Sequence, residues 1–110
     1  MSLRRPVVIP RHIEHLLYRL ADVRSRIHVY LSKYEYEELF ELYREILKTL
    51  VILLPQQLKR RFKLEAIDAA KSVEELDKIA SKLKTAIDRY YSRMRIEMYG
   101  YEEIEEWLNI

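Results

Sequence analysis

Apolar residues recur in this chain at alternating spacings of three and four, and this pattern constrains the fold more than any other feature. One series runs from Ile13 to Tyr30, a second from Tyr36 to Leu53, and a third from Val73 to Met94. Such spacings place side chains on one face of an α-helix. The 110 residues include one glycine and three prolines, too few turn-forming residues for an all-β fold. The sequence therefore predicts an all-α domain.

The prolines and the glycine mark the expected helix ends. Pro10 suits the start of a helix at about residue 11, because its fixed φ is compatible with the first helical turn. Pro55 ends the second helix, since proline cannot continue the hydrogen-bond ladder. A short third helix is expected over residues 56–71. Its predicted core side consists of Leu58, Phe62, Ala66, Ala69 and Ala70.

A capping sequence predicts the start of a long fourth helix. Ser72 and Glu75 have the spacing of a capping box, in which the serine hydroxyl accepts from the N–H of Glu75 and the glutamate reaches back. This helix is expected to extend to about Tyr99. Gly100 follows where a helix end needs a left-handed residue, so a separate short helix is expected after it.

These elements predict an antiparallel four-helix bundle with a short C-terminal fifth helix. Residues 1–10 are expected to form an extended basic arm, residues 11–99 the bundle, and residues 100–110 an acidic amphipathic helix. The second helix has an unusually wide apolar face, to which Phe40, Leu47 and Leu54 contribute. We expect this helix either to lie centrally in the bundle or to share its extra face with a second subunit.

Charge is distributed unevenly along the chain. The sequence holds 20 basic and 18 acidic residues, for a net charge of +2. All 20 basic residues and 14 acidic ones precede Gly100, which gives that part a charge of 20 − 14 = +6. The last eleven residues carry four glutamates and no basic residue, a charge of −4. A partner for the first part is therefore expected to be acidic.

The sequence lacks the motifs of most enzymes and metal proteins. It has no cysteine, no glycine-rich phosphate loop, no nucleophile elbow and no His-Glu-x-x-His pattern. His12 and His15 are three residues apart but have no obvious third ligand, so we interpret them as surface histidines. We therefore expect no enzymatic activity, no cofactor and no metal.

The hydropathy pattern predicts a cytoplasmic protein. The longest apolar stretch is five residues, from Leu50 to Leu54, and the first ten residues do not resemble a signal peptide. Few glutamines and asparagines accompany the many charges, a composition typical of hyperthermophilic proteins.

Basic residues concentrate in two segments that are expected to bind the phosphate backbone of nucleic acid. In the third helix, Lys59 and Lys63 are expected to share a face that Arg60 and Arg61 flank. In the fourth helix, Lys82, Arg89 and Arg93 follow one stripe, beside Tyr90 and Tyr91. The predicted contact residues are Lys59, Arg60, Arg61, Lys63, Arg89 and Arg93. The alternative is a solvated surface whose cations pair with Glu65, Asp68 and Asp88.

The acidic C-terminal segment is the predicted site for a protein partner. Tyr101, Ile104, Trp107 and Leu108 fall on one side of a helix too short to be stable alone. They are expected to dock in the groove of a partner, with Trp107 as the main anchor. Alternatively the segment closes the end of its own bundle. If it lies over the basic stripe, its charge would mask that stripe.

The segment Arg24-Ser-Arg-Ile-His28-Val-Tyr30 resembles the arginine–histidine element of HEPN domains, helical bundles that often act as metal-independent ribonucleases. The resemblance implies phosphate-binding and acid–base roles for Arg24 and His28. This sequence departs from the family pattern, since three residues rather than four to six separate the pair. The element also lies in the N-terminal quarter, whereas the family carries it in the C-terminal half.

The sequence thus favours a non-catalytic small helical module of a nucleic-acid-handling assembly. Its general look is similar to small helical subunits of archaeal CRISPR effectors and to helix bundles attached to plasmid replication proteins, although no residue motif assigns it to either. The alternative is a structural protein–protein interaction module or homo-oligomeric adaptor without nucleic-acid binding. An apolar patch of Phe40, Leu47 and Leu54 left exposed would favour that alternative. A HEPN-like ribonuclease is the third hypothesis.

Overall fold

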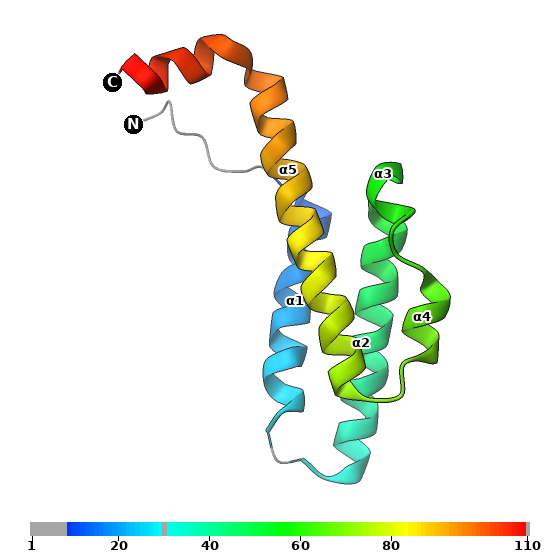
Figure 1. Cartoon of the computed structure of the whole chain (residues 1–110). Helices are drawn as coiled ribbons and strands as arrows, with labels where there is room; N and C mark the ends of the chain where they lie inside the picture. The colour runs from blue at the N-terminus through cyan, green and yellow to red at the C-terminus, as the bar shows by residue number, and fades with distance from the viewer. Residues whose placement is uncertain (1–8, 30, 110) are drawn as a thin grey trace.

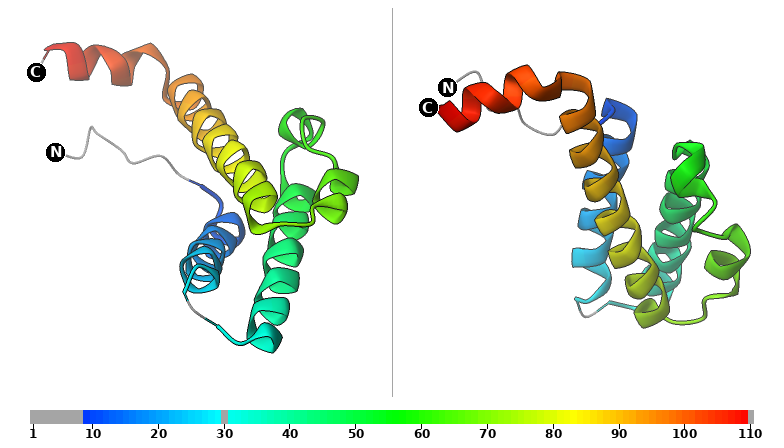
Figure 2. Two further views of the ribbon diagram at one scale, coloured as in Figure 1. Left: turned by 60° about the horizontal axis from the view of Figure 1, so that its bottom comes forward. Right: turned by 45° about the horizontal axis from the view of Figure 1, so that its top comes forward.

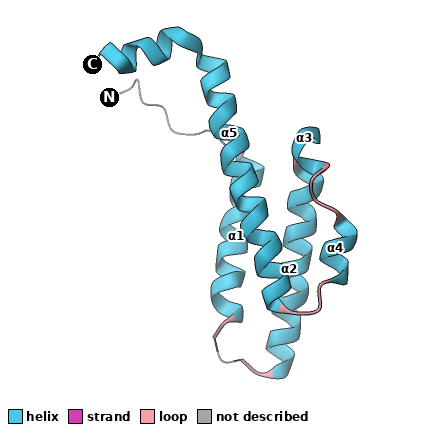
Figure 3. Ribbon diagram, viewed as in Figure 1, coloured by secondary structure: helices cyan, strands magenta, loops and turns pink. Residues whose placement is uncertain are grey.

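The computed structural model describes the backbone of residues 9–29 and 31–109, and the side chains of residues 9–29 and 31–93. These residues contain helices and loops but no strand (Figure 3). The helices are α1 (Arg11–Ile27), α2 (Lys33–Leu53), α3 (Gln56–Lys59), α4 (Leu64–Ala69) and α5 (Val73–Asn109). The predicted all-α fold is confirmed. Among the helices described, none is both long and apolar enough to cross a membrane.

Three long helices form the body of the molecule (Figure 1). α1 runs antiparallel to α2, and the α3–α4 segment brings the chain back along α2. α5 therefore runs in the same direction as α2, as the two views of Figure 2 also show. Two short helices, α3 and α4, thus replace the single helix predicted for residues 56–71.

The helix starts follow local capping chemistry. α1 begins at Arg11, directly after Pro10, as predicted. At the start of α2, the Ser32 hydroxyl accepts from the Glu35 N–H at 3.2 Å, and the Glu35 carboxylate accepts from the Ser32 N–H at 3.4 Å. This capping box has the same serine–glutamate spacing as Ser72 and Glu75. The Ser72 hydroxyl likewise accepts from the Glu75 N–H at 3.2 Å, which confirms the predicted cap of α5.

The core is built from the predicted apolar series. Ile13, Leu20, Val23 and Ile27 of α1 are buried. Leu39, Tyr43, Ile46, Leu47, Leu50 and Val51 of α2 are buried with them. α5 adds Val73, Leu76, Ala80, Leu83, Ala86, Ile87 and Tyr91. Spacings of three and four put these side chains on one face of each helix, and burying those faces against one another is the main driving force for the fold.

Most of the wide apolar face of α2 is covered within the chain, although Ile52 and Leu53 at its end are exposed. Leu47 is fully buried and Leu54 nearly so, while Phe40 is half-buried and packs under the guanidinium of Arg44. α2 is in contact with α1, α4 and α5. The helix therefore lies centrally, and the patch of Phe40, Leu47 and Leu54 that would favour an oligomer is not exposed.

The prediction of one helix over residues 56–71 is wrong. α3 ends at Lys59, and Lys63 has an extended backbone with φ −104° and ψ 129° before α4 begins. A continuous helix would hold the four cations of residues 59–63 within little more than one turn, where they repel one another. The break also shifts the helical phase. Ile67 is buried, whereas Ala66 and Ala69, predicted for the core, are exposed.

Arg44, on α2, holds α4 in place through hydrogen bonds. Its guanidinium donates to the carbonyl oxygens of Ile67 at 2.6 Å, Asp68 at 2.8 Å and Ala70 at 3.1 Å. These carbonyls lie at the end of α4, where intrahelical donors run out. The Ile67 carbonyl also accepts from the Ala70 N–H at 3.3 Å. Lys48, one turn along α2, adds an ion pair with the carboxylate of Asp68 at 3.0 Å. α4 is too short to be stable alone, so these bonds and the burial of Ile67 hold it in place.

α5 does not end before Gly100 as predicted. The helix is continuous from Val73 to Asn109 and includes Gly100. Its last turns extend beyond the other helices (Figure 1). Glycine lowers the stability of a helix interior by only about 1 kcal/mol relative to alanine, so its presence does not require the helix to end.

Candidate nucleic-acid interface

A basic groove lies between α5 and the turn that follows α3. Its volume is about 400 Å³. Arg61 and Phe62 form one wall, and α5 forms the other with Ser81, Lys82, Thr85, Ala86 and Arg89. We refer to these seven residues as the basic groove. It unites two segments about twenty residues apart in the sequence.

The break after α3 positions the first wall. The N–H of Arg61 donates to the carbonyl of Leu58 at 2.9 Å, and the N–H of Phe62 donates to that of Lys59 at 3.2 Å. Because Leu58 is buried, this turn is anchored to the core. The tight turn therefore holds Arg61 and Phe62 beside α5.

The second wall is the polar face of α5. Lys82, Thr85 and Arg89 follow one another at steps of three and four, so they lie on one face of the helix. Leu83 and Ile87, on another face of the same turns, are fully buried. The amphipathic pattern that buries one side of α5 thus presents its cations on the outside.

Among the described side chains, those that line the basic groove carry positive charge and no negative charge. Arg61, Lys82 and Arg89 line it, and no acidic side chain does. Among the side chains that the structure describes, no ion pair involves any of these three cations. With the hydroxyl groups of Ser81 and Thr85, they provide donors of the kinds that bind phosphate oxygens.

The carboxylates predicted as partners of the basic residues lie elsewhere. Asp68 pairs with Lys48, on α2. Asp88 lines a different groove, between α1 and α5, together with Lys84 and Arg24. Glu65 is exposed on α4 and forms no ion pair with any side chain that the structure describes. These positions leave the cations of the basic groove available to an external anion.

Two of the six predicted nucleic-acid contacts, Arg61 and Arg89, meet in the basic groove. The structure adds Lys82, which the sequence analysis placed on the same stripe without including it among the contacts. Arg60, Lys63 and Arg93 are exposed but do not line the groove. Lys59 is half-buried, and the chain leaves the helix before Lys63, so the predicted face shared by these two lysines does not exist.

The aromatic residue of the site is Phe62 rather than the predicted tyrosines. Tyr91 is buried, and its ring packs edge-on against the half-buried ring of Tyr90 at 5.0 Å between centroids. Burial, followed by the nearby Tyr90, raises the pKa of the Tyr91 hydroxyl. Phe62 instead packs partly against the core and lines the groove together with the cations.

A cluster around Asp77 joins α1, α2 and α5. The Asp77 carboxylate accepts a short hydrogen bond from the buried Tyr43 hydroxyl. It also lies 3.3 Å from Nε of Arg24 and 3.1 Å from Nε2 of His28. Burial, and then the hydrogen bond to Asp77, raise the pKa of Tyr43. Asp77 could not be found from the sequence pattern because its partners Tyr43, His28 and Arg24 are 34, 49 and 53 residues away along the chain.

This cluster contains the two residues that resemble the HEPN element. The side chain of Arg24 is 32% exposed and that of His28 is 56% exposed, so both reach solvent. Each nevertheless has a carboxylate partner within the chain, and Tyr30 lies outside the described residues. The arrangement ties three helices together through Asp77. The ribonuclease hypothesis stays a prediction.

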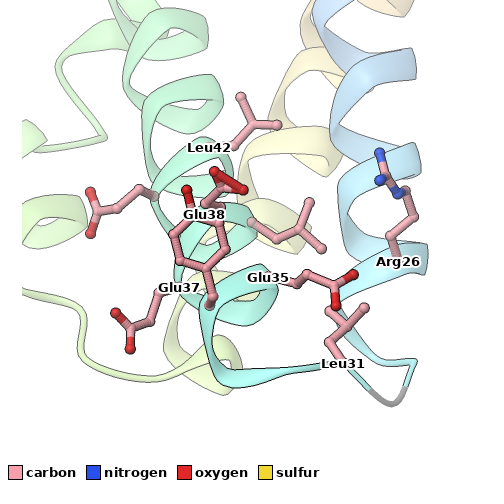
Figure 4. Close-up of a pocket in the computed structure, with 9 residues that line it drawn as sticks. Arg26, Leu31, Glu35, Glu37, Glu38 and Leu42 are labelled. Carbon is pink, nitrogen blue, oxygen red and sulfur yellow. The ribbon is translucent and has the colours of Figure 1, made fainter.

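A second groove, of about 790 Å³, has the opposite charge. It lies at the α1–α2 connection, where α2 contributes Glu35, Glu37, Glu38 and Glu41. Figure 4 shows Arg26, on α1, across this groove from the glutamates. α2 thus carries acidic residues at its start, while the basic groove is formed by α5 and the turn after α3. A phosphate backbone is repelled from the first and attracted to the second.

The remaining site predictions concern residues with little structural context. His12 and His15 are exposed, and the described residues contain no group of three or more His, Asp or Glu side chains able to hold a metal ion. The partner-binding residues Tyr101, Ile104, Trp107 and Leu108 lie outside the residues whose side chains are described. Their role stays a prediction, as does masking of the basic stripe by the acidic segment.

Comparisons of the chain with protein-family models, with curated proteins and with solved structures find no match.

Proposed function

We propose that the protein is a non-catalytic helical module of a nucleic-acid-handling assembly and binds the phosphate backbone through its basic groove. The observation that carries this proposal is the meeting of Arg61, Lys82 and Arg89 in one groove without an acidic side chain. Charged groups on a protein surface are usually interspersed with opposite charges. Three cations converging on one hollow favour an anionic ligand with several charges.

The surface around the groove extends the positive field. Lys78, Lys82, Arg89 and Arg93 are exposed, and their steps of four and seven place them along one stripe of α5. At 1.5 Å per residue the stripe is about 22 Å long. A polymer with evenly spaced phosphates can contact several of these cations at once, whereas a single small anion can contact only a few.

Fluorescence anisotropy with labelled single- and double-stranded DNA and RNA tests the proposal. Three phosphate contacts give slopes of log affinity against log salt of about −2 for single strands and −2.7 for duplexes. Affinity is then expected to fall roughly 20- to 40-fold between about 50 and 200 mM salt.

Matched charge reversals locate the binding surface. Arg61→Glu combined with Arg89→Glu is expected to abolish binding. Arg19→Glu combined with Lys33→Glu, at exposed positions on α1 and α2, changes the net charge equally and is expected to retain most of the affinity. Circular dichroism checks that both variants fold. The proposal is overturned if the wild-type chain binds no nucleic acid, or if both double variants bind equally well.

A further inference from the structure

The basic groove contains an aromatic ring as well as cations. Phe62 is half-buried, with part of its side chain packed against the core and part lining the groove. The groove places Arg61 on the same wall and Lys82 and Arg89 on the opposite wall. A ring at such a position offers apolar contact in the middle of a binding site for phosphates.

This combination suits a strand whose bases are accessible. In a duplex the bases are stacked inside, and a protein surface of this kind meets phosphates and sugars. A single strand exposes the faces of its bases, which stack on aromatic side chains while cations hold the backbone. A volume of about 400 Å³ is also in the range of pockets for small molecules, and therefore of the size that one nucleotide needs.

The spacing of the cations fits a phosphate on each side of one base. Lys82 and Arg89 are seven residues apart, which corresponds to about 10 Å along α5. Thr85 lies between them, and the Phe62 wall faces this stretch of helix. A base stacked on Phe62 thus has cations near both of its neighbouring phosphates.

The other exposed aromatic residues do not share this setting. Tyr34 and Tyr36 belong to the glutamate-rich start of α2. Tyr18 lines a groove in which Glu14 and Asp88 balance Arg24 and Lys84. A nucleic acid strand that stacked on these rings would place its phosphates beside carboxylates, which repel them. Phe62 instead lines a groove whose charged side chains, Arg61, Lys82 and Arg89, are all cationic.

We propose that the basic groove takes single-stranded nucleic acid, with one base stacked on Phe62 and its flanking phosphates held by Arg61, Lys82 and Arg89. This inference rests on the proposed function and adds the class of ligand. It differs from that function in requiring a base, since backbone binding alone needs only phosphates.

The test compares three labelled ligands of equal length with the full chain: a thymidine oligonucleotide, the same backbone with abasic residues, and a duplex. Stacking of one base predicts that the intact single strand binds roughly 5- to 150-fold more tightly than the abasic strand. At about 200 mM salt, where backbone attraction is weaker, the single strand is also expected to bind more tightly than the duplex.

Phe62→Leu is the matching variant, because leucine keeps apolar volume against the core but offers no aromatic face. It is expected to lose the preference for the intact strand while its affinity for the abasic strand stays unchanged. Tyr18→Leu, an exposed ring on α1, is the control and is expected to keep the preference. If Phe62→Leu does not fold, the comparison of intact and abasic strands with the wild-type chain still decides whether binding requires a base.

The outcomes separate the two proposals. Equal affinity for intact and abasic strands, or tighter binding of the duplex at 200 mM salt, overturns single-strand recognition and leaves the backbone-binding function intact. A preference for the intact strand that Phe62→Leu retains overturns the role of Phe62. Failure of the wild-type chain to bind any of the three ligands overturns both proposals.

Discussion

Arg44 is the side chain through which α2 holds α4, and Arg44→Met is expected to destabilise the protein strongly. The guanidinium donates three hydrogen bonds to carbonyls at the end of α4, and the arginine side chain is only 14% exposed. Methionine has a similar helix propensity and retains apolar packing against Phe40, so the substitution removes mainly these bonds.

The size of the effect follows from the partners of each bond. Hydrogen bonds from a charged donor contribute about 1.5–3 kcal/mol each. The bonds to Ile67 and Ala70 are partly buried, whereas the one to Asp68 is exposed and water can replace it. Taking the two partly buried bonds near the lower limit gives a loss of about 3 kcal/mol in the free energy of unfolding. The exposed ion pair with Glu41 adds little.

Urea denaturation followed by circular dichroism measures this loss, and a thermal scan is expected to show Tm lower by roughly 10 °C or more. Arg19→Met is the matched control, because Arg19 is exposed on α1 and forms no ion pair with any described side chain. Its stability is expected to stay within about 0.5 kcal/mol of wild type. A loss for Arg44→Met no larger than that of the control would refute the role assigned to Arg44.

Two further predictions concern the cluster around Asp77. Asp77→Ala leaves the buried Tyr43 hydroxyl without its acceptor and is expected to lower the free energy of unfolding, measured by chemical denaturation, by about 1–3 kcal/mol. Asp77→Asn keeps an acceptor oxygen and is expected to lower it less. Equal losses for the two variants would contradict this explanation. The partly exposed contacts of Asp77 with Arg24 and His28 add at most about 1 kcal/mol each. The raised pKa of Tyr43 means that the folded chain keeps a proton that the unfolded chain loses above its ordinary pKa of 10.0. This contribution is complete below pH 10, and above it the stability is expected to fall by about 1.4 kcal/mol per pH unit from this group. Tyr43→Phe is expected to remove this part of the slope of unfolding free energy against pH. Equal slopes for variant and wild type between pH 9 and 11 would contradict the role assigned to Tyr43.

Much of the fold could be predicted because its determinants are local. The apolar series identify the buried faces of α1, α2 and α5, and Pro10, Pro55 and Ser72 lie at the predicted boundaries. The capping box at Ser32 has the same sequence signal, although the analysis did not use it. The break between α3 and α4 was not predicted, although the repulsion among the cations of residues 59–63 is local. The position of α4 could not be predicted in this way, because it depends on burying Ile67 and on Arg44, whose acceptors are 23 to 26 residues away.

The candidate site likewise has features that the sequence predicts and features that depend on the tertiary structure. The sequence alone named Arg61 and Arg89 among the predicted nucleic-acid contacts, because charge density and helical spacing are readable along the chain. Both residues line the basic groove. The sequence did not identify which of the basic residues meet, and it named Tyr90 and Tyr91 instead of Phe62. The burial of Tyr91 and the position of Phe62 depend on how α5 packs against the turn after α3.

The sequence by itself thus determined the helical class, the faces that are buried and the presence of excess positive charge before Gly100. Tertiary structure decided which charges pair among the described side chains. Asp68 pairs with Lys48, and Asp88 lines the groove between α1 and α5. The groove lined by Arg61, Lys82 and Arg89 therefore has no carboxylate among its lining residues. Hydrophobic periodicity is a property of neighbouring residues, whereas the electrostatic balance of a groove depends on side chains that only folding brings together.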